Sequence, residues 1–164
     1  MLTALEPDTF PWLDYRRYSF SLGVRHGPGV WRSGHTASAY DPATGSVGVR
    51  GDMAAQAAVA WDKVERLLAA AGLGPEAVTR VVEYVTAEGL AAYEKAVEAR
   101  AGRLGTNQPP VAIVAVERLL RPEALLEVEV TASGAPRDDG LVHLGSLTAP
   151  ESSSAPPGSA WAMS

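Results

Sequence analysis

The segment between Asp52 and Gly72 constrains the fold most, because its apolar side chains recur at steps of three and four residues. This spacing is typical of an α-helix that buries one face. Asp52 can cap the first turn of the helix and Gly72 can end the last. The opposite side carries charged residues, Lys63 among them, and we expect that side to face solvent. The apolar stripe consists of Ala57, Ala60, Trp61, Val64, Leu67, Leu68 and Ala71.

Strand patterns occur on both sides of this helix. Before it, turn residues separate three extended runs, the first with clear apolar alternation, so a three-stranded antiparallel start is expected. After it, a Val-rich run predicts a strand in which Val82 and Tyr84 face away from Glu83. Two further β-rich runs follow toward the end of the chain. The predicted strands are 18–24, 30–36, 47–50, 79–85, 111–116 and 124–131.

A second helix is predicted between Thr86, which can cap it, and Gly102, which can end it. Leu90, Tyr93 and Val97 would share one face of this helix. The predicted order is therefore βββαβαββ. It describes an α+β fold in which two helices pack on one face of a mostly antiparallel sheet.

One domain accounts for most of the 164-residue chain, because a second full core would not fit. We expect an N-terminal extension over 1–16, the folded domain over 17–132 and a flexible tail over 133–164 that is rich in Ser, Pro and Gly. Within the tail, 140–149 is similar to 29–37, which makes it a candidate remnant of a second repeat.

The composition excludes several classes of function. A net charge of −5, with scattered Lys and Arg, gives no basic face for nucleic acid. The chain has no cysteine and its histidines lack metal-ligand spacing, so neither a metal nor another cofactor is predicted. It also has no apolar run of the roughly 20 residues that span a membrane and no signal-peptide pattern, so we expect a cytoplasmic protein.

Five short motifs occur in a fixed order along the chain. They are Ser33-Gly34-His35, Asp41-Pro42-Ala43-Thr44-Gly45, Asp52-Met53-Ala54-Ala55-Gln56, Arg118-Leu119 and Leu126-Glu127-Val128-Glu129-Val130-Thr131-Ala132. Together they resemble the RidA/YjgF family of reactive-intermediate imine deaminases over about residues 18–132. The resemblance implies a chorismate-mutase-like fold, a homotrimer and ligand clefts between subunits. A sheet with helices on one face needs a partner for its other face, which agrees with such an assembly.

The resemblance also locates a departure at Val111. In the deaminating branch of the family, an arginine seven residues before the Arg118-Leu119 pair holds a substrate carboxylate. Valine has neither charge nor donor, and each lost hydrogen bond would be worth about 1.5–3 kcal/mol. We therefore expect hydrolysis of ordinary 2-imino acids to be slow or absent. Glu127 aligns with the glutamate that positions the attacking water, although it could equally be an ordinary polar residue of an alternating strand.

Two more family positions are changed. The tyrosine of the first strand falls on Phe20, and Tyr18, two residues earlier, could replace its hydroxyl. The alternative is that both rings simply fill a core or an interface. Leu90 stands where the family has an asparagine. These changes indicate a remodelled pocket.

Gly34 and His35 lie in the second extended run, 30–36, where the resemblance places a wall of the cleft. His35 could exchange protons near neutral pH, or it could be a solvent-facing strand residue. Arg32 and Glu83 could supply compensating charges, and Glu83 could instead pair with an arginine.

These residues predict an enzyme that acts on a small organic intermediate in an intersubunit cleft by acid/base catalysis. The reaction would be a hydrolysis or deamination, a dehydration or a cyclisation, such as one in secondary metabolism. One alternative is a non-catalytic binding or regulatory trimer. Another is an imine deaminase whose carboxylate anchor is Arg32 or Arg118. The predicted catalytic residues are Glu127, His35 and Tyr18, and the predicted substrate-binding residues are Phe20, Gly34, Val111, Leu90 and Arg32.

Overall fold

In the computed structural model of the chain, residues 1–135 and 144–146 are described, the last three by their backbone alone. Within these residues, seven strands form one sheet and two form a separate hairpin. The sheet contains β1 (Leu2–Leu5), β2 (Gly23–His26), β3 (Gly29–Arg32), β6 (Val78–Thr86), β7 (Val111–Val116), β8 (Leu126–Ser133) and β9 (Leu144–Ser146), and the hairpin contains β4 (Ala39–Asp41) and β5 (Ser46–Gly48). The helices are α1 (Met53–Ala70), α2 (Ala87–Leu90) and α3 (Tyr93–Leu104), with 3₁₀ turns η1 (Tyr15–Arg17) and η2 (Pro75–Ala77).

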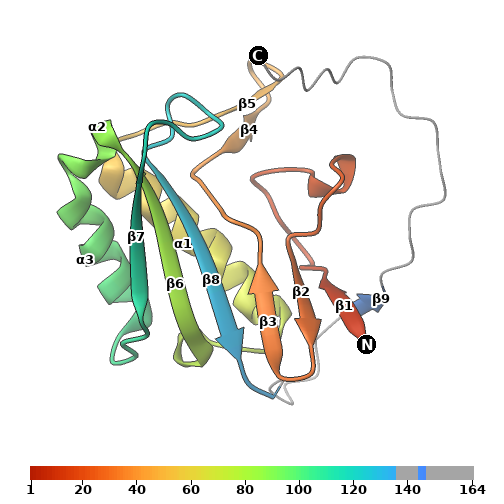
Figure 1. Cartoon of the computed structure of the whole chain (residues 1–164). Helices are drawn as coiled ribbons and strands as arrows, with labels where there is room; N and C mark the ends of the chain where they lie inside the picture. Colours follow the sequence, from red (N-terminus) through yellow and green to blue (C-terminus); the bar gives the residue numbers. More distant parts are fainter. Residues whose placement is uncertain (136–143, 147–164) are drawn as a thin grey trace.

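The strands of the sheet lie in the order β7-β6-β8-β3-β2-β1-β9. Among these described strands, β6 and β7 pair in parallel and the other neighbours pair in antiparallel. The helices α1 and α3 lie on one face of the sheet (Figure 1). This arrangement confirms the predicted α+β class, with helices on one face of a mostly antiparallel sheet.

Helix α1 forms where its apolar periodicity predicts it. The Asp52 carboxylate accepts a hydrogen bond from the Ala55 amide at 3.0 Å, so the helix begins with a capped first turn. Trp61 and Val64 are fully buried against the sheet. Lys63 is an exception to the predicted solvent-facing side, because it is only 1% exposed. A second layer of chain, the N-terminal segment, covers this flank of the helix, as Trp12 lies over the Lys63 ammonium group.

The region predicted as one second helix forms two separate helices, α2 and α3. Thr86 caps α2, as expected, by accepting a hydrogen bond from the Gly89 amide at 3.1 Å. The helix stops after one turn, where Gly89 packs so tightly that an added Cβ would lie 2.7 Å from the Leu125 carbonyl oxygen. Helix α3 then continues past Gly102 and ends at Gly105, which adopts a φ of 58°. The predicted end at Gly102 is therefore wrong.

The N-terminal part of the chain differs most from prediction. The expected strand over 18–24 does not form as such, because β2 begins only at Gly23. Its neighbour is β1, which lies within the expected extension and pairs Ala4 with Val24. The two strands pack closely where they pair. A Cβ at Gly23 would lie 3.0 Å from the Leu5 side chain, which is fully buried. The first two predicted runs do pair in antiparallel orientation, as β2 with β3. The third run lies instead in the hairpin of β4 and β5, which is separate from the main sheet, so this part of the predicted three-stranded start is wrong.

The predicted tail lies largely outside the described residues. The backbone of β9 is described, and it pairs with β1 in antiparallel orientation. No helix in the described part of the chain is long and apolar enough to cross a membrane.

Candidate functional site

Glu127 lies on the face of the sheet that the helices leave open. Along β8, Leu126 and Val128 are fully buried under the helices, whereas Glu127 and Glu129 alternate with them and are half-buried. Burial raises the pKa of Glu127 above its usual value, and the nearby charge of Glu129 raises it further. A carboxyl group of this kind holds a proton more readily than a solvated one, which suits a general acid or base.

Gly34 packs directly against the Glu127 carboxylate. A Cβ at Gly34 would lie 2.0 Å from Oε1 of Glu127, so only a residue without a side chain allows the present position. The loop that carries Gly34 is fixed to the preceding segment. The Ser33 amide donates to the Leu22 carbonyl at 3.0 Å, and the Ser33 hydroxyl donates to the Ser21 carbonyl at 2.8 Å. The structure thus brings Gly34 and Glu127 together.

Tyr18 and Phe20 precede the segment to which Ser33 is bonded. Their rings lie 5.8 Å apart in a tilted contact, and both side chains are exposed. Because Ser21 follows them directly and bonds Ser33, the two rings lie in the segment that adjoins the Gly34 loop. They belong to irregular chain and not to a strand, so the expected period-two facing does not apply to them.

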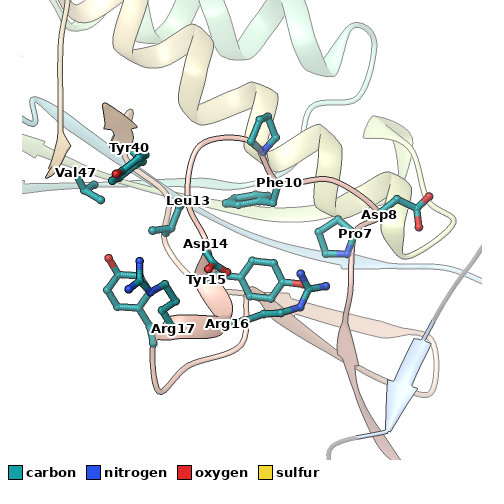
Figure 2. Close-up of a pocket in the computed structure, with 12 residues that line it drawn as sticks. Pro7, Asp8, Phe10, Leu13, Asp14, Tyr15, Arg16, Arg17, Tyr40 and Val47 are labelled. Carbon is teal, nitrogen blue, oxygen red and sulfur yellow. The ribbon is translucent and has the colours of Figure 1, made fainter. Parts of the chain in front are cut away.

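A pocket of about 490 Å³ lies beside Tyr18, between the N-terminal segment 7–18 and the hairpin of β4 and β5. Figure 2 shows Tyr40 and Val47 at one end of this pocket and Pro7 and Asp8 at the other. Of the predicted site residues, Tyr18 lines it, whereas Glu127 does not. The pocket is therefore separate from the Glu127 carboxylate.

Hydrogen bonding holds the pocket's Tyr15 in place. Its hydroxyl donates to Glu6 at 2.7 Å, and the Arg16 guanidinium lies 5.0 Å above its ring. Burial raises the pKa of Tyr15 to about 12, and the hydrogen bond to Glu6 contributes in the same direction. This phenol is a fixed part of the wall and not a ready proton donor.

Val111 and Leu90 lie at the far edge of the sheet. Val111 begins the edge strand β7, which is separated from β8 by β6. Leu90 ends α2 and is 45% exposed. Within one chain, β6 therefore separates Val111 from Glu127.

His35 and Arg32 lie on the helix-covered face. His35 pairs with the buried Val128 through two backbone hydrogen bonds of 2.9 Å, so the two side chains point to the same side. Burial lowers the pKa of His35 to about 3, and the charges of Arg32 and Lys63 lower it further. Arg32 donates from Nη1 to the Val64 carbonyl on α1 at 2.9 Å. The structure does not bring these two residues to Glu127.

Sequence reasoning missed Tyr84 as a neighbour of the carboxylates. Tyr84 pairs with Glu127 across β6 and β8, and its hydroxyl reaches Glu129 at 3.4 Å. The signal was present, since the alternation in this strand placed Tyr84 opposite Glu83. Only the pairing of β6 with β8 was missing.

Glu83 has the predicted arginine partner. It is fully buried and accepts hydrogen bonds from Arg100 and from the Tyr93 hydroxyl, the latter at 2.6 Å. The Arg100 side chain is itself only 15% exposed. Among the described residues, no group of three or more His, Asp or Glu side chains could hold a metal ion.

The chain matches the family described as endoribonuclease L-PSP over residues 15–133. A YjgF/YER057c/UK114 family member from Mycobacterium tuberculosis is 27% identical, with a TM-score of 0.65 over 82% of this chain and all of that one. A Pseudomonas aeruginosa protein of unknown function is 28% identical, with a TM-score of 0.66 over 81% of this chain and 92% of its own.

A more distant structure, E. coli TdcF with bound serine, shares the fold at 22% identity, with a TM-score of 0.64 over 80% of this chain and 98% of that one. No curated protein matches the chain. The family match covers most of the chain, and the structures agree with it in fold. The chain therefore belongs to the RidA/YjgF family.

Proposed function

We propose that the protein is a homotrimeric enzyme that hydrolyses a small, uncharged imine in a cleft between subunits, with Glu127 as the general base and acid. The observation that carries the proposal is the Glu127 carboxylate, which has a raised pKa and is seated against Gly34 on the open face of the sheet. Within the described residues it forms no hydrogen bond or ion pair that would occupy it with a structural task.

The edge strand β7 supports the trimer. Its sequence, Val-Ala-Ile-Val-Ala-Val, is apolar at every position, as in strands that are buried on both faces. In the single chain, however, Ile113 is 52% exposed and Val114 is 39% exposed. An apolar edge of this kind is normally covered by a partner. If neighbouring subunits close on it, Val111 and Leu90 of one subunit would approach Glu127 of the next.

The charge distribution supports an uncharged substrate. Val111 offers no charge, and the alternative anchor Arg32 is bonded to α1 on the other face of the sheet. A substrate carboxylate would therefore lack these two partners in the cleft. An apolar imine needs no such partner, and the exposed rings of Tyr18 and Phe20 could contact it.

The reaction follows from the position of one carboxylate. Glu127 takes a proton from water as the water oxygen bonds to the imine carbon. That proton passes to the imine nitrogen and gives a neutral carbinolamine. Glu127 then takes the proton of the carbinolamine hydroxyl and delivers it to the nitrogen as the carbon–nitrogen bond breaks, so the products are a ketone and ammonia. The non-catalytic alternative predicts binding of the same ligand without these products.

The test measures ammonia release from benzophenone imine, which is apolar, and from 2-iminopropionate, which carries a carboxylate. We expect the unmodified protein to accelerate the first reaction over buffer and to leave the second nearly unchanged. Glu127→Gln should lose activity by roughly 100-fold or more, as expected for a general acid or base. The matched variant Glu129→Gln should stay within a few-fold of the unmodified protein. Saturable binding of the imine without ammonia release would favour the non-catalytic trimer.

Two further measurements test the role of Val111 and the trimeric assembly separately. Val111→Arg should raise the hydrolysis of 2-iminopropionate, because a guanidinium can bind a carboxylate through two hydrogen bonds. Sedimentation should give about three times the 17.2 kDa mass of the chain. A single-chain mass would contradict the intersubunit cleft.

A further inference from the structure

A cluster of basic side chains is enclosed on the helix-covered side of the sheet. Arg32 ends β3, His35 follows it, and Lys63 comes from α1. Their exposed fractions are only 6%, 7% and 1%. Basic groups buried to this extent are normally paired with a carboxylate.

The partners of this cluster are all neutral backbone oxygens. Lys63 Nζ donates to the Thr36 carbonyl at 2.8 Å and to the Ser38 carbonyl at 2.5 Å. Arg32 uses one nitrogen on the Val64 carbonyl. No ion pair within the described residues involves Arg32, His35 or Lys63. Two positive charges therefore remain buried without a counter-charge from that part of the chain.

Several nitrogen atoms of the cluster have no hydrogen-bond partner among the described residues. They are Arg32 Nε and Nη2 and His35 Nε2, all of which are buried. The lowered pKa of His35 has burial as its main cause, followed by the charges of Arg32 and Lys63, so both cations act on this one ring. Buried donors without acceptors are rare in folded proteins, and each requires an explanation.

The N-terminal segment covers the cluster. The Phe10 ring lies 5.9 Å from the His35 ring, and the Lys63 ammonium group lies 5.8 Å from the centre of the Trp12 ring. The Tyr40 amide donates to the Trp12 carbonyl at 2.7 Å, which ties this cover to the hairpin of β4 and β5. The two aromatic rings cover this side of the cluster, which favours a small ion over a large one.

We propose that Arg32, His35 and Lys63 form a binding site for a small inorganic monoanion, of which chloride is the simplest. The anion would accept hydrogen bonds from the free guanidinium nitrogens and offset the uncompensated charge. This site lies on the opposite face of the sheet from Glu127 and has no part in the proposed hydrolysis. By holding residues 10–12 on the core, the ion would stabilise the segment that continues to Tyr18 and Phe20.

The test uses bromide, which replaces chloride and scatters X-rays anomalously. The melting temperature of the full chain is measured while sodium gluconate is replaced by sodium bromide at constant ionic strength. We expect a saturable rise of roughly 5 °C when bromide is well above its dissociation constant. Crystals grown in bromide should show an anomalous peak within hydrogen-bond distance of Arg32 and Lys63.

Lys63→Met removes one charge of the cluster and should abolish both the saturable rise and the peak. The matched control is Lys95→Met, which changes the net charge equally at an exposed position. It should keep the full bromide response. An equal response in the two variants would overturn the site.

If Lys63→Met does not fold, the crystals and the melting temperature of the unmodified protein in bromide still test the proposal. The absence of an anomalous peak at these residues would overturn the proposal. A peak without a saturable rise in solution would mean binding at crystal concentration only, and would overturn it as well.

Discussion

Glu83 and Glu127 lie on neighbouring strands of one sheet but differ in burial and in hydrogen bonding. Glu83 on β6 is fully buried on the helix-covered face and is held by Arg100 and Tyr93. Glu127 on β8 lies on the open face, is half-buried, and has no hydrogen-bond partner among the described residues. The more deeply buried carboxylate is therefore the one whose charge is compensated.

The comparison shows that depth of burial is a poor guide to reactivity. A buried ionised group persists only with a partner, and such a pair is held in place by both members. Glu83 is best understood as part of the attachment of α3 to the sheet. Glu127, whose pKa is raised and whose oxygens are free, retains the capacity to exchange a proton.

The largest expected effect comes from breaking the Glu83 pair. Arg100→Met leaves Glu83 buried without its charged partner, and we expect the free energy of unfolding to fall by about 3–5 kcal/mol. Urea denaturation followed by circular dichroism measures this change. Arg103→Met is a matched control on the same helix, because Arg103 forms more exposed pairs with Asp62 and Glu65. It should cost about 1 kcal/mol or less.

The double variant Glu83→Leu with Arg100→Met sharpens this result. Removing both charges avoids the buried unpaired carboxylate, so most of the lost stability should return. If Arg100→Met and Arg103→Met lower the free energy of unfolding equally, the buried pair of Glu83 and Arg100 stabilises the fold no more than an exposed pair.

The next largest effect is expected at Gly34, which packs against the Glu127 carboxylate. In Gly34→Ala the new Cβ would displace the carboxylate, since Oε1 now lies 2.0 Å from that position. The end of a glutamate side chain can move, so we expect a loss of stability below about 1 kcal/mol. Imine hydrolysis should nevertheless fall by roughly 10- to 100-fold, because the base is no longer correctly placed. Gly48→Ala is the control, as nothing lies within 4 Å of a Cβ there.

The long, strongly patterned segments could be predicted from sequence. The apolar stripe of α1 repeats several times, so the helix and the face that buries Trp61 were predicted correctly, and the β-rich run 124–131 was predicted as a strand. The pairing of Glu83 with an arginine followed from the cost of burying a carboxylate alone.

The N-terminal half could not be predicted in the same way. The run 18–24 has the alternation of a strand, but pairing depends on distant partners, and Leu2–Leu5 pairs with β2 instead. Lys63 was expected in solvent because helical periodicity describes one helix and not the chain that covers its flank. His35 was placed in the cleft by resemblance, whereas the backbone pairing with Val128 turns it to the other side.

The smallest effect tests the free carboxylate through pH. The folded pKa of Glu127 is raised above the value of 4.5 for an unperturbed glutamate, chiefly by burial and then by Glu129. Between these two values the folded state binds more protons than the unfolded state, so the contribution of Glu127 to stability falls as pH rises through this window. At neutral pH the ionised side chain is therefore a cost, which Glu127→Gln removes.

The melting temperature of Glu127→Gln should exceed that of the unmodified protein by roughly 1–2 °C at pH 7, and the difference should disappear below pH 4.5. The control Glu117→Gln removes the same charge from an exposed loop residue and should show no such gain. A destabilised Glu127→Gln at pH 7 would mean that Glu127, like Glu83, is held by a favourable partner. Loss of activity together with a gain in stability would instead distinguish a carboxylate kept for chemistry from one kept for the fold.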